Sequence, residues 1–377
     1  NIDKGNFTCG VFLDLQKAFD TVNHNILLQK LDHYGVSGGI NDWFYSFLSD
    51  RKQYVSIESE NSSVLEIEYG VPQGSVLGPF LFLIYINDLR HCLTNALAHH
   101  FADDTSILLS HPSLKVMRKS LGNELKKLFD WLCANRLSLN SQKTDLILFK
   151  PSSRKTELRL TVKIGDTKIF PSNTVKYLGV LIDTALTWRP QIEELSKKLT
   201  RVVAILSKVR HFVPFNTLKC LYYSLFQSYI SYGCLVWGFA STGDLQRLFR
   251  IQKQAIRVIT FSDFQEPSSK LFADTQILKL ADLIELNKYM FMYEWKHGKL
   301  PSSFNSLFSE KEICKGTRLA SHGKLYIPKI RTMKYGERSL RFAGTKILNH
   351  IINLQVDLDV SKMQFKRQLL ALFIATY

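Results

Sequence analysis

Two adjacent aspartates, Asp103 and Asp104, lie between an apolar, partly aromatic run and a second apolar run. This pattern predicts a β-hairpin with both carboxylates at its tip. Ionised carboxylates beside apolar strands repel one another and are costly to desolvate, and a divalent cation is their usual neutralising partner. A metal site is one interpretation of the pair, and an ordinary turn, for which Asp is well suited, is the other.

A third acid, Asp14, interrupts the apolar strand predicted over residues 10–15. Buried strands do not carry an acid without a reason, so Asp14 is a second candidate metal ligand. Hard carboxylate oxygens suit Mg²⁺, which keeps several waters and binds substrate phosphates. Two such ions support in-line phosphoryl transfer, and that chemistry needs no covalent nucleophile.

The elements around these acids follow the order strand, helix, helix, strand pair, helix, strand. Helices are predicted from about residue 23 to 34 and from 41 to 50, the second burying Trp43 and Phe44, and a hairpin is predicted to turn at 60–62. A further helix covers 114–132, and a strand covers 145–149. This order is typical of an α+β sheet covered on one face by helices, which can bring Asp14 and Asp103 onto neighbouring strands.

A glycine-rich loop over residues 70–79 runs into an apolar helix predicted over 80–89, with Ser75 as its cap and Pro79 in its first turn. Glycines let a nucleotide approach the backbone closely, and a helix N-terminus attracts phosphate. A plain structural turn is the alternative interpretation of this loop.

Basic residues are concentrated in the second part of the chain. Residues 1–150 hold 14 Lys and Arg against 16 Asp and Glu, whereas residues 151–377 hold 35 against 17. Two amphipathic helices, predicted over 192–209 and 245–259, carry basic faces. Their candidate backbone-binding residues are Lys197, Lys198, Arg201, Arg247, Arg250, Lys253 and Arg257. This charge predicts a polyanionic partner such as nucleic acid, although a solvated helix face is the simpler alternative.

The cysteines bear on the cellular compartment, and one uncharged stretch bears on a possible membrane span. Six cysteines without a C-x-x-C pair fit a reducing, intracellular compartment. Residues 220–239 carry no charge, but Leu218, Tyr222 and Phe226 recur at helical spacing, which predicts one buried amphipathic helix in place of a membrane span.

In their order, these motifs resemble those of reverse transcriptases from LINE-type, non-long-terminal-repeat retrotransposons. Five stretches carry the resemblance: residues 12–22, 70–79, 101–104, 137–144 and 175–183. It implies a right-hand polymerase fold, with a palm whose antiparallel sheet is covered by helices, then a mainly helical thumb and a helical C-terminal region. The expected division is palm with residual fingers over 1–150, a strand hairpin over 151–185, a basic thumb over 186–262, and a basic C-terminal region over 263–377.

The resemblance also implies roles for individual residues. Asp14, Asp103 and Asp104 would be catalytic and, with the Leu15 carbonyl, would bind two Mg²⁺ ions, for which Mn²⁺ could substitute. The residues expected to contact the nucleotide are Leu15, Phe19, Gln73, Gly74 and Lys143. Phe19 would act as the gate that favours deoxynucleotides, and Lys143 could donate a proton to pyrophosphate. The hairpin Tyr177-Leu178-Gly179 would grip the primer end.

The resemblance further implies an RNA template, a DNA primer, their hybrid and deoxynucleoside triphosphates as partners. The family's finger strands and endonuclease precede the first aspartate motif, so we expect a fragment that lacks both. The family alone suggests a nucleus or a cytoplasmic ribonucleoprotein as the location.

Two alternatives remain open. An RNA-dependent RNA polymerase shares the paired-acid hairpin but has no use for the bulky side chain of Phe19. A catalytically incomplete remnant would bind nucleic acid through its basic half and catalyse nothing.

Overall fold

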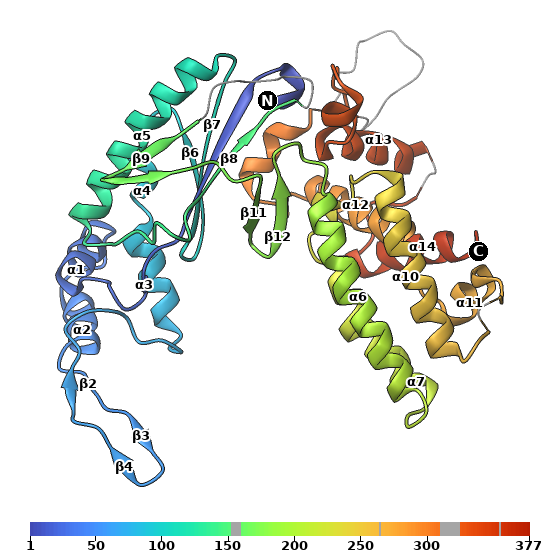
Figure 1. Ribbon diagram of the computed structural model, residues 1–377, viewed down its shortest axis with the longest axis horizontal. Coiled ribbons are helices and arrows are strands. Elements are labelled where there is room, and N and C mark those ends of the chain that lie inside the picture. Colours follow the sequence, from blue (N-terminus) through green and yellow to red (C-terminus); the bar gives the residue numbers. More distant parts are fainter. Residues whose placement is uncertain (152–159, 264, 310–324, 354–355) are drawn as a thin grey trace. The chain divides into compact units, whose positions relative to one another are not determined.

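The computed structural model describes residues 1–151, 160–263, 265–309, 325–353 and 356–377. The chain divides into two compact units, Asn1–Gly179 and Val180–Tyr377 (Figure 1). Each unit has its own hydrophobic core. In the described part of the chain, no helix has both the length and the apolar character needed to cross a membrane.

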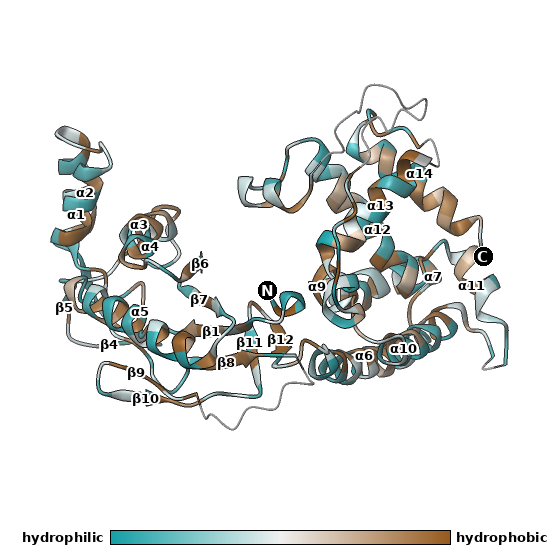
Figure 2. Ribbon diagram, turned by 90° about the horizontal axis from the view of Figure 1, so that it is seen from above, coloured by the Kyte–Doolittle hydropathy of each residue, from teal (hydrophilic) through white to brown (hydrophobic). Residues whose placement is uncertain are grey.

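The first unit is built on a four-stranded antiparallel sheet with the order β6-β7-β1-β8. Its strands are β1 (Phe7–Leu13), β6 (Leu97–Phe101), β7 (Asp104–His111) and β8 (Asp145–Phe149). Val11 of the central strand β1 pairs with Ile107 on one side and Leu146 on the other, and all three side chains are fully buried. The central strand β1 and the edge strand β8 are coloured mostly as hydrophobic in Figure 2, and most of their residues are buried. The predicted sheet is therefore confirmed.

Helices of the first unit complete this core. They are α1 (His24–His33), α2 (Gly39–Leu48), α3 (Leu77–Ile86), α4 (Leu89–Cys92) and α5 (Leu114–Ala134). Helix α5 packs against β1 and β7 because Met117, Leu121 and Leu128 recur on one buried face. Helix α1 starts where predicted, since the Asn23 side chain accepts a hydrogen bond from the Ile26 amide and caps it.

Short strand pairs lie outside the four-stranded sheet. They are β2 (Lys52–Gln53) with β5 (Leu65–Glu66), β3 (Ser56–Ile57) with β4 (Glu60–Asn61), β9 (Val162–Ile164) with β10 (Thr167–Ile169), and β11 (Thr174–Tyr177) with β12 (Val180–Asp183). A single 3₁₀ turn, Ile2–Lys4, precedes β1.

Two local predictions in the first unit were wrong. Trp43 is 53% exposed and stacks on Phe47 at the helix surface, because α2 packs on α1 with Phe44 and Leu48 as its buried residues. The hairpin turns before Glu60, since Ile57 pairs with Glu60 and Glu58 takes a positive φ of 54°. Asn61 therefore lies in a strand and not in the turn.

The second unit is almost entirely helical. Its helices are α6 (Arg189–Val209), α7 (Phe215–Leu221), α8 (Ser228–Ser231), α9 (Cys234–Trp237), α10 (Thr242–Thr260), α11 (Ser268–Thr275), α12 (Leu280–Lys296), α13 (Leu340–Asn353) and α14 (Lys362–Ile374), with a 3₁₀ turn Ser302–Leu307 and a π-helical turn Met333–Glu337. The two predicted amphipathic helices are confirmed as α6 and α10, which pack side by side (Figure 1). One core joins α6 near the start of the unit to α14 near its end.

The predicted helix over 220–239 is confirmed only in part. Leu218, Tyr222 and Phe226 are fully buried at the expected spacing, but a π-helical turn, Tyr222–Gln227, joins α7 to α8. The helix then ends at Ser231, because Gly233 takes a left-handed φ of 63° and starts the separate helix α9.

Candidate active site

The three aspartates lie at one end of the central strands. The last pair of the β1–β7 ladder is Leu13 with Thr105, so continuing the antiparallel register places Asp14 opposite Asp104. Phe101 pairs with Asp104 across the β6–β7 hairpin, and Ala102 takes a φ of 53° to close its two-residue turn. The predicted hairpin tip, with Asp103 in the turn and Asp104 beside it, is confirmed.

Two of the carboxylates at this end act on the third. The pKa of Asp104 is raised from its usual value, first by partial burial and then by repulsion from the carboxylates of Asp103 and Asp14. The negative charges of Asp103 and Asp14 are therefore close enough to disfavour ionisation of Asp104. A cation bound among them would remove this repulsion.

A cleft of about 530 Å³ opens beside these acids. Six of the predicted metal and nucleotide residues line it: Asp14, Leu15, Phe19, Gln73, Asp103 and Lys143. They come from four stretches of the chain that are separated by up to 129 positions in sequence, from 14 to 143. Asp104 and Gly74 do not line the cleft.

The glycine-rich loop is held against the segment that follows Asp14. The Val71 amide donates to the Phe19 carbonyl at 2.8 Å, and Gln73 Nε2 donates to Asp20 Oδ1 at 2.8 Å. Gly70 takes a φ of 89°, and a Cβ at this position would lie 2.8 Å from backbone atoms of Asp20. Only glycine allows this close approach. Packing alone therefore explains the glycine at position 70, and no ligand needs to be invoked for it.

Pro79 lies in the first turn of α3 as predicted, but the N-cap position is that of Val76, and Ser75 lies one residue before it. Ser75 Oγ accepts from the Gly78 amide at 2.9 Å and donates to the Pro72 carbonyl at 2.7 Å. The helix itself begins at Leu77, three residues earlier than predicted. Phe19 lies against this helix with its ring centroid 4.8 Å from that of Phe82, and it is half-buried at the cleft wall.

A second loop fixes the side of the cleft that carries Lys143. The Asn140 amide donates to the Asp14 carbonyl at 2.8 Å, and the Gln16 amide donates to the Ser138 carbonyl at 2.9 Å. Thr144 is buried, and its hydroxyl donates to the Asn140 carbonyl at 2.8 Å. These bonds set the exposed Lys143 at the cleft that Asp14 also lines.

The candidate primer-binding residues form a tight turn after β11. Leu178 and Gly179 both take positive φ, 45° and 78°, as a two-residue hairpin loop requires. The Tyr177 ring lies 4.9 Å from that of Phe12 in β1, and Ser106 Oγ donates to its hydroxyl at 3.4 Å. The turn is thus attached to the same two strands that end at the aspartates.

The candidate basic residues of the second unit differ in their surroundings. Lys197, Arg201, Arg247 and Arg250 are exposed. Lys198 forms an ion pair with Glu194 at 3.5 Å, and Lys253 Nζ lies 4.5 Å from the centroid of the Phe249 ring. Arg257 is half-buried, and its guanidinium donates to the Glu266 carbonyl at 3.1 Å.

Reasoning from the sequence missed several cleft residues. They are Gln16, Lys17, Ala18, Thr21, Ser138 and Asn140. All six lie inside two of the quoted stretches, 12–22 and 137–144, but polar and small residues of ordinary type give no signal of their own. The pairing of Leu15 with Leu139 brings the two stretches together, and it could not be read from either alone.

A known protein family matches the residues of the first unit. Residues 1–182 match the family model described as "Reverse transcriptase (RNA-dependent DNA polymerase)". This stretch contains every predicted metal, nucleotide and primer residue. The resemblance of residues 1–182 to the enzymes of LINE-type, non-long-terminal-repeat retrotransposons is confirmed by this match and by the curated relatives.

One of these relatives is the probable RNA-directed DNA polymerase from transposon X-element of Drosophila melanogaster. It is 27% identical, and the match covers 81% of this chain and 34% of the relative. Another is the RNA-directed DNA polymerase from mobile element jockey of the same species, which is 28% identical over 75% of this chain and 32% of its own length. The chain spans about a third of the length of these relatives. A solved telomerase of Candida tropicalis aligns with 96% of this chain and 49% of its own, at 12% identity and a TM-score of 0.39.

Proposed function

We propose that this chain is the polymerase part of a retrotransposon reverse transcriptase, which extends the 3′-hydroxyl of a DNA primer with deoxynucleotides on an RNA template. The observation that carries the proposal is the single cleft in which Asp14 and Asp103 face Phe19, Gln73 and Lys143. Two acids, an aromatic side chain and a cation are what binding and transfer of a nucleotide require. The family match of residues 1–182 supports the same reaction.

The acids fit a magnesium-dependent reaction. No group of three or more His, Cys, Asp and Glu side chains within the described ranges is arranged around one point. Two carboxylates with a backbone carbonyl are nevertheless enough for Mg²⁺, because this ion keeps waters and takes oxygens from substrate phosphates. Asp14, Asp103 and the Leu15 carbonyl would hold the ions, with Asp104 beside them. When bound, two Mg²⁺ ions activate the attacking hydroxyl and stabilise the leaving pyrophosphate.

The other cleft residues would bind and select the nucleotide. Phe19 is supported from behind by Phe82, so its ring would resist displacement by a 2′-hydroxyl and favour deoxyribose. Gln73 and Gly74 would pack against the incoming nucleotide and the template base. Lys143 would lie near the triphosphate and donate a proton to pyrophosphate.

Contacts with the primer and the duplex would come from residues outside the cleft. Tyr177, Leu178 and Gly179 would hold the primer end through the tight turn after β11. The basic residues of α6 and α10 would contact the phosphate backbone of the RNA–DNA hybrid without reading its sequence.

The test is primer extension on an annealed RNA template with Mg²⁺ and deoxynucleotides. We would compare the chain as given, a version extended upstream, Asp103→Ala, and the matched control Asp130→Ala. Asp130 lies exposed on α5 and does not line the cleft, so its loss changes the net charge equally.

If Asp130→Ala still extends the primer and Asp103→Ala does not, the polymerase activity and the role of Asp103 in it are established together. If both the chain and the extended version bind the hybrid but never extend it, the proposal fails and the binding remnant replaces it.

A further inference from the structure

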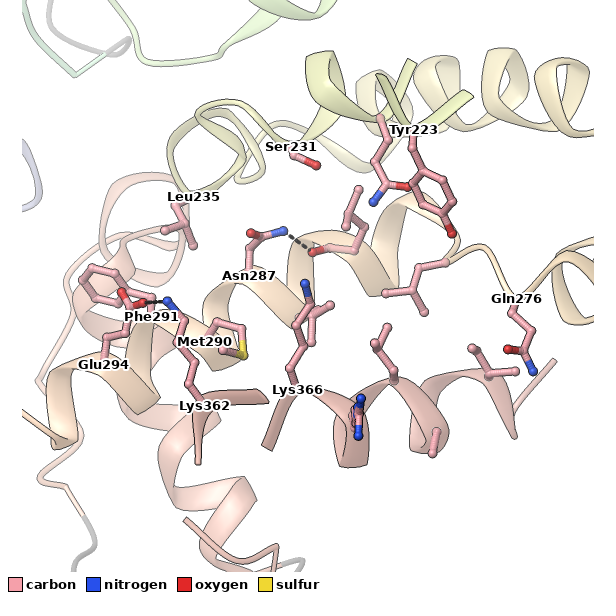
Figure 3. Close-up of a pocket in the computed structure, with 18 residues that line it drawn as sticks. Tyr223, Ser231, Leu235, Gln276, Asn287, Met290, Phe291, Glu294, Lys362 and Lys366 are labelled. Atoms are coloured by element: carbon pink, nitrogen blue, oxygen red, sulfur yellow. Dashed lines mark hydrogen bonds and ion pairs between the residues drawn. The ribbon is translucent and has the colours of Figure 1, made fainter. Parts of the chain in front are cut away.

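A second cavity, of about 800 Å³, lies inside the second unit between α12 and α14 and shares no residue with the cleft of the aspartates. Figure 3 shows the side chains that line it. Its apolar lining includes Leu283, Leu286, Met290, Leu370 and Ile374. Its volume lies within the range of about 300–1,000 Å³ typical of sites that enclose a small organic molecule.

The charged groups at this cavity are mostly positive. Lys362, Lys366 and Arg367 line it from α14, whereas Glu294 is the acid that lines it from α12. Lys362 is already paired with Glu294 (Figure 3). Lys366 and Arg367 are exposed, and neither forms an ion pair with any residue that the structure describes. The cavity therefore has two uncompensated cations at an apolar interior.

Aromatic and amide groups face the same cavity. Tyr223 is 40% exposed and lies on the π-helical turn between α7 and α8, and Phe291 lies on α12. Interruptions of this type in a helix frequently mark functional sites. Asn287 Nδ2 donates to the Leu283 carbonyl at 2.7 Å, which fixes the orientation of its amide at the cavity (Figure 3).

We propose that this cavity is a binding site for single-stranded nucleic acid, which inserts one base among the apolar and aromatic side chains and places its backbone phosphate against Lys366 and Arg367. Stacking on aromatic rings combined with phosphate contacts is how single strands are bound without sequence readout. The inference rests on the proposed function only in that it takes nucleic acid as the partner. It needs neither the aspartates nor polymerisation.

An acidic peptide with apolar side chains is the competing occupant. It would satisfy the two cations equally well, but its carboxylate and aliphatic side chains offer no flat ring to Tyr223 and Phe291. The excess of basic residues across residues 151–377 also favours a long polyanion over a short acidic segment.

The test measures binding of a labelled 12-nucleotide oligo(U) RNA by fluorescence anisotropy at several salt concentrations, on a background that carries Asp103→Ala. The double variant Lys366→Ala/Arg367→Ala is compared with Lys270→Ala/Lys296→Ala, which removes two exposed lysines outside the cavity. We expect at least a tenfold loss of affinity in the first variant. The slope of log affinity against log salt should fall by about 0.7, since that is the contribution of each phosphate neutralised on a single strand and the two cations share one phosphate.

A third variant, Ala371→Trp, fills the cavity from an exposed position on α14 and leaves every charge in place. It should weaken RNA binding without changing the salt slope. Thermal unfolding of each variant checks that the fold is intact. Photo-cross-linking of the same RNA carrying 4-thiouridine should label peptides that contain Tyr223 or Phe291.

The inference is overturned if both double variants bind RNA equally, or if a glutamate-rich apolar peptide binds the cavity while RNA does not. Its failure is separate from that of the proposed function. For this comparison, primer extension on a pre-annealed template is measured in the same cavity variants with Asp103 restored. Extension that persists in all of them, with unchanged RNA binding, refutes the cavity site alone. Cavity-dependent RNA binding without any extension by the chain that keeps Asp103 refutes the polymerase alone.

Discussion

The backbone amide of Asn140 donates a hydrogen bond to the backbone carbonyl of Asp14 at 2.8 Å. This bond joins the loop that carries Lys143 to the residue that carries the first candidate metal ligand. Because the Gln16 amide donates to Ser138 on the same pair of segments, the two loops form a short antiparallel bridge. The separation of Asp14 and Lys143 is thus set by main-chain bonds, independent of either side chain.

Replacing Asn140 by proline removes this amide and should lower the rate of primer extension while binding of the primer-template remains. The lost bond leaves the Asp14 carbonyl without this donor, at a cost of about 1–3 kcal/mol in the free energy of unfolding. Urea unfolding and single-turnover extension measure the two effects. Asn140→Ala keeps the amide, so a loss of stability as large as that of the proline variant would contradict the explanation.

Substitution of Phe19 by valine should admit ribonucleotides. The smaller side chain leaves space beside the sugar, and the contact with the Phe82 ring is lost. The ratio of kcat/KM for a ribonucleotide to that for its deoxynucleotide should rise at least tenfold. Phe170→Val, at a residue that is 66% exposed and does not line the cleft, is the matched control. Unchanged sugar selectivity in Phe19→Val would remove the gate assignment.

Gly70→Ala should disrupt the glycine-rich loop far more than Gly74→Ala. Both glycines take positive φ, but only at Gly70 would the added Cβ collide with the backbone of Asp20. Gly74→Ala should therefore cost only the backbone strain, about 1–2 kcal/mol. We expect Gly70→Ala to lose primer extension and to unfold at lower urea. Equal effects of the two substitutions would show that the close approach to Asp20 is unimportant.

The first unit should lose stability in acid, because Glu124 stabilises it only while its carboxyl group is ionised. Burial alone would raise the pKa of this carboxyl, but hydrogen bonds from the Thr94 hydroxyl and amide, the Asn95 amide and Lys127 lower it to about 2. A lowered pKa in the folded state means that the ionised carboxylate adds stability above the unfolded pKa of 4.5 and that this stability is lost as pH falls toward 2. The contribution at pH 7 is on the order of 3 kcal/mol.

Glu124→Gln tests this linkage. The variant should be less stable than the parent at pH 7, and the difference between the two should shrink as pH falls from about 5 to 3. Denaturant unfolding at each pH measures it. A difference that stays constant over this range would mean that the carboxylate charge is not what the four donors stabilise.

The sequence was sufficient for elements whose local pattern agrees with their surroundings. Strand β8 begins and ends at the predicted residues, and α6 and α10 follow from residues repeated every three or four positions. It was insufficient where tertiary packing decides. Nothing in residues 220–239 signals the π-helical turn at Tyr222, and the exposure of Trp43 depends on how α2 packs on α1.

The candidate site also contains residues that the sequence could reveal and residues that it could not. Asp14 and Asp103 are unusual enough in their apolar surroundings to be found from the sequence. Asn140 and Thr21 reach the cleft through the folding of their loops, and their side chains are of common polar types. The different surroundings of the basic residues were also hidden, because helical spacing cannot tell an exposed guanidinium from one that is bonded to a carbonyl.

The different surroundings of the arginines of α10 give the last prediction. Arg247 and Arg250 are exposed on α10, whereas Arg257 of the same predicted stripe donates to the Glu266 carbonyl. Arg247→Ala and Arg250→Ala should each weaken binding of an RNA–DNA hybrid and lower its log–log salt slope by up to about 0.9. Arg257→Ala should leave the slope unchanged and instead lower the unfolding temperature, because it removes a structural hydrogen bond. Anisotropy titrations over a range of salt measure the slope. A change of slope in Arg257→Ala as large as in the other two would show that its guanidinium leaves Glu266 to contact phosphate.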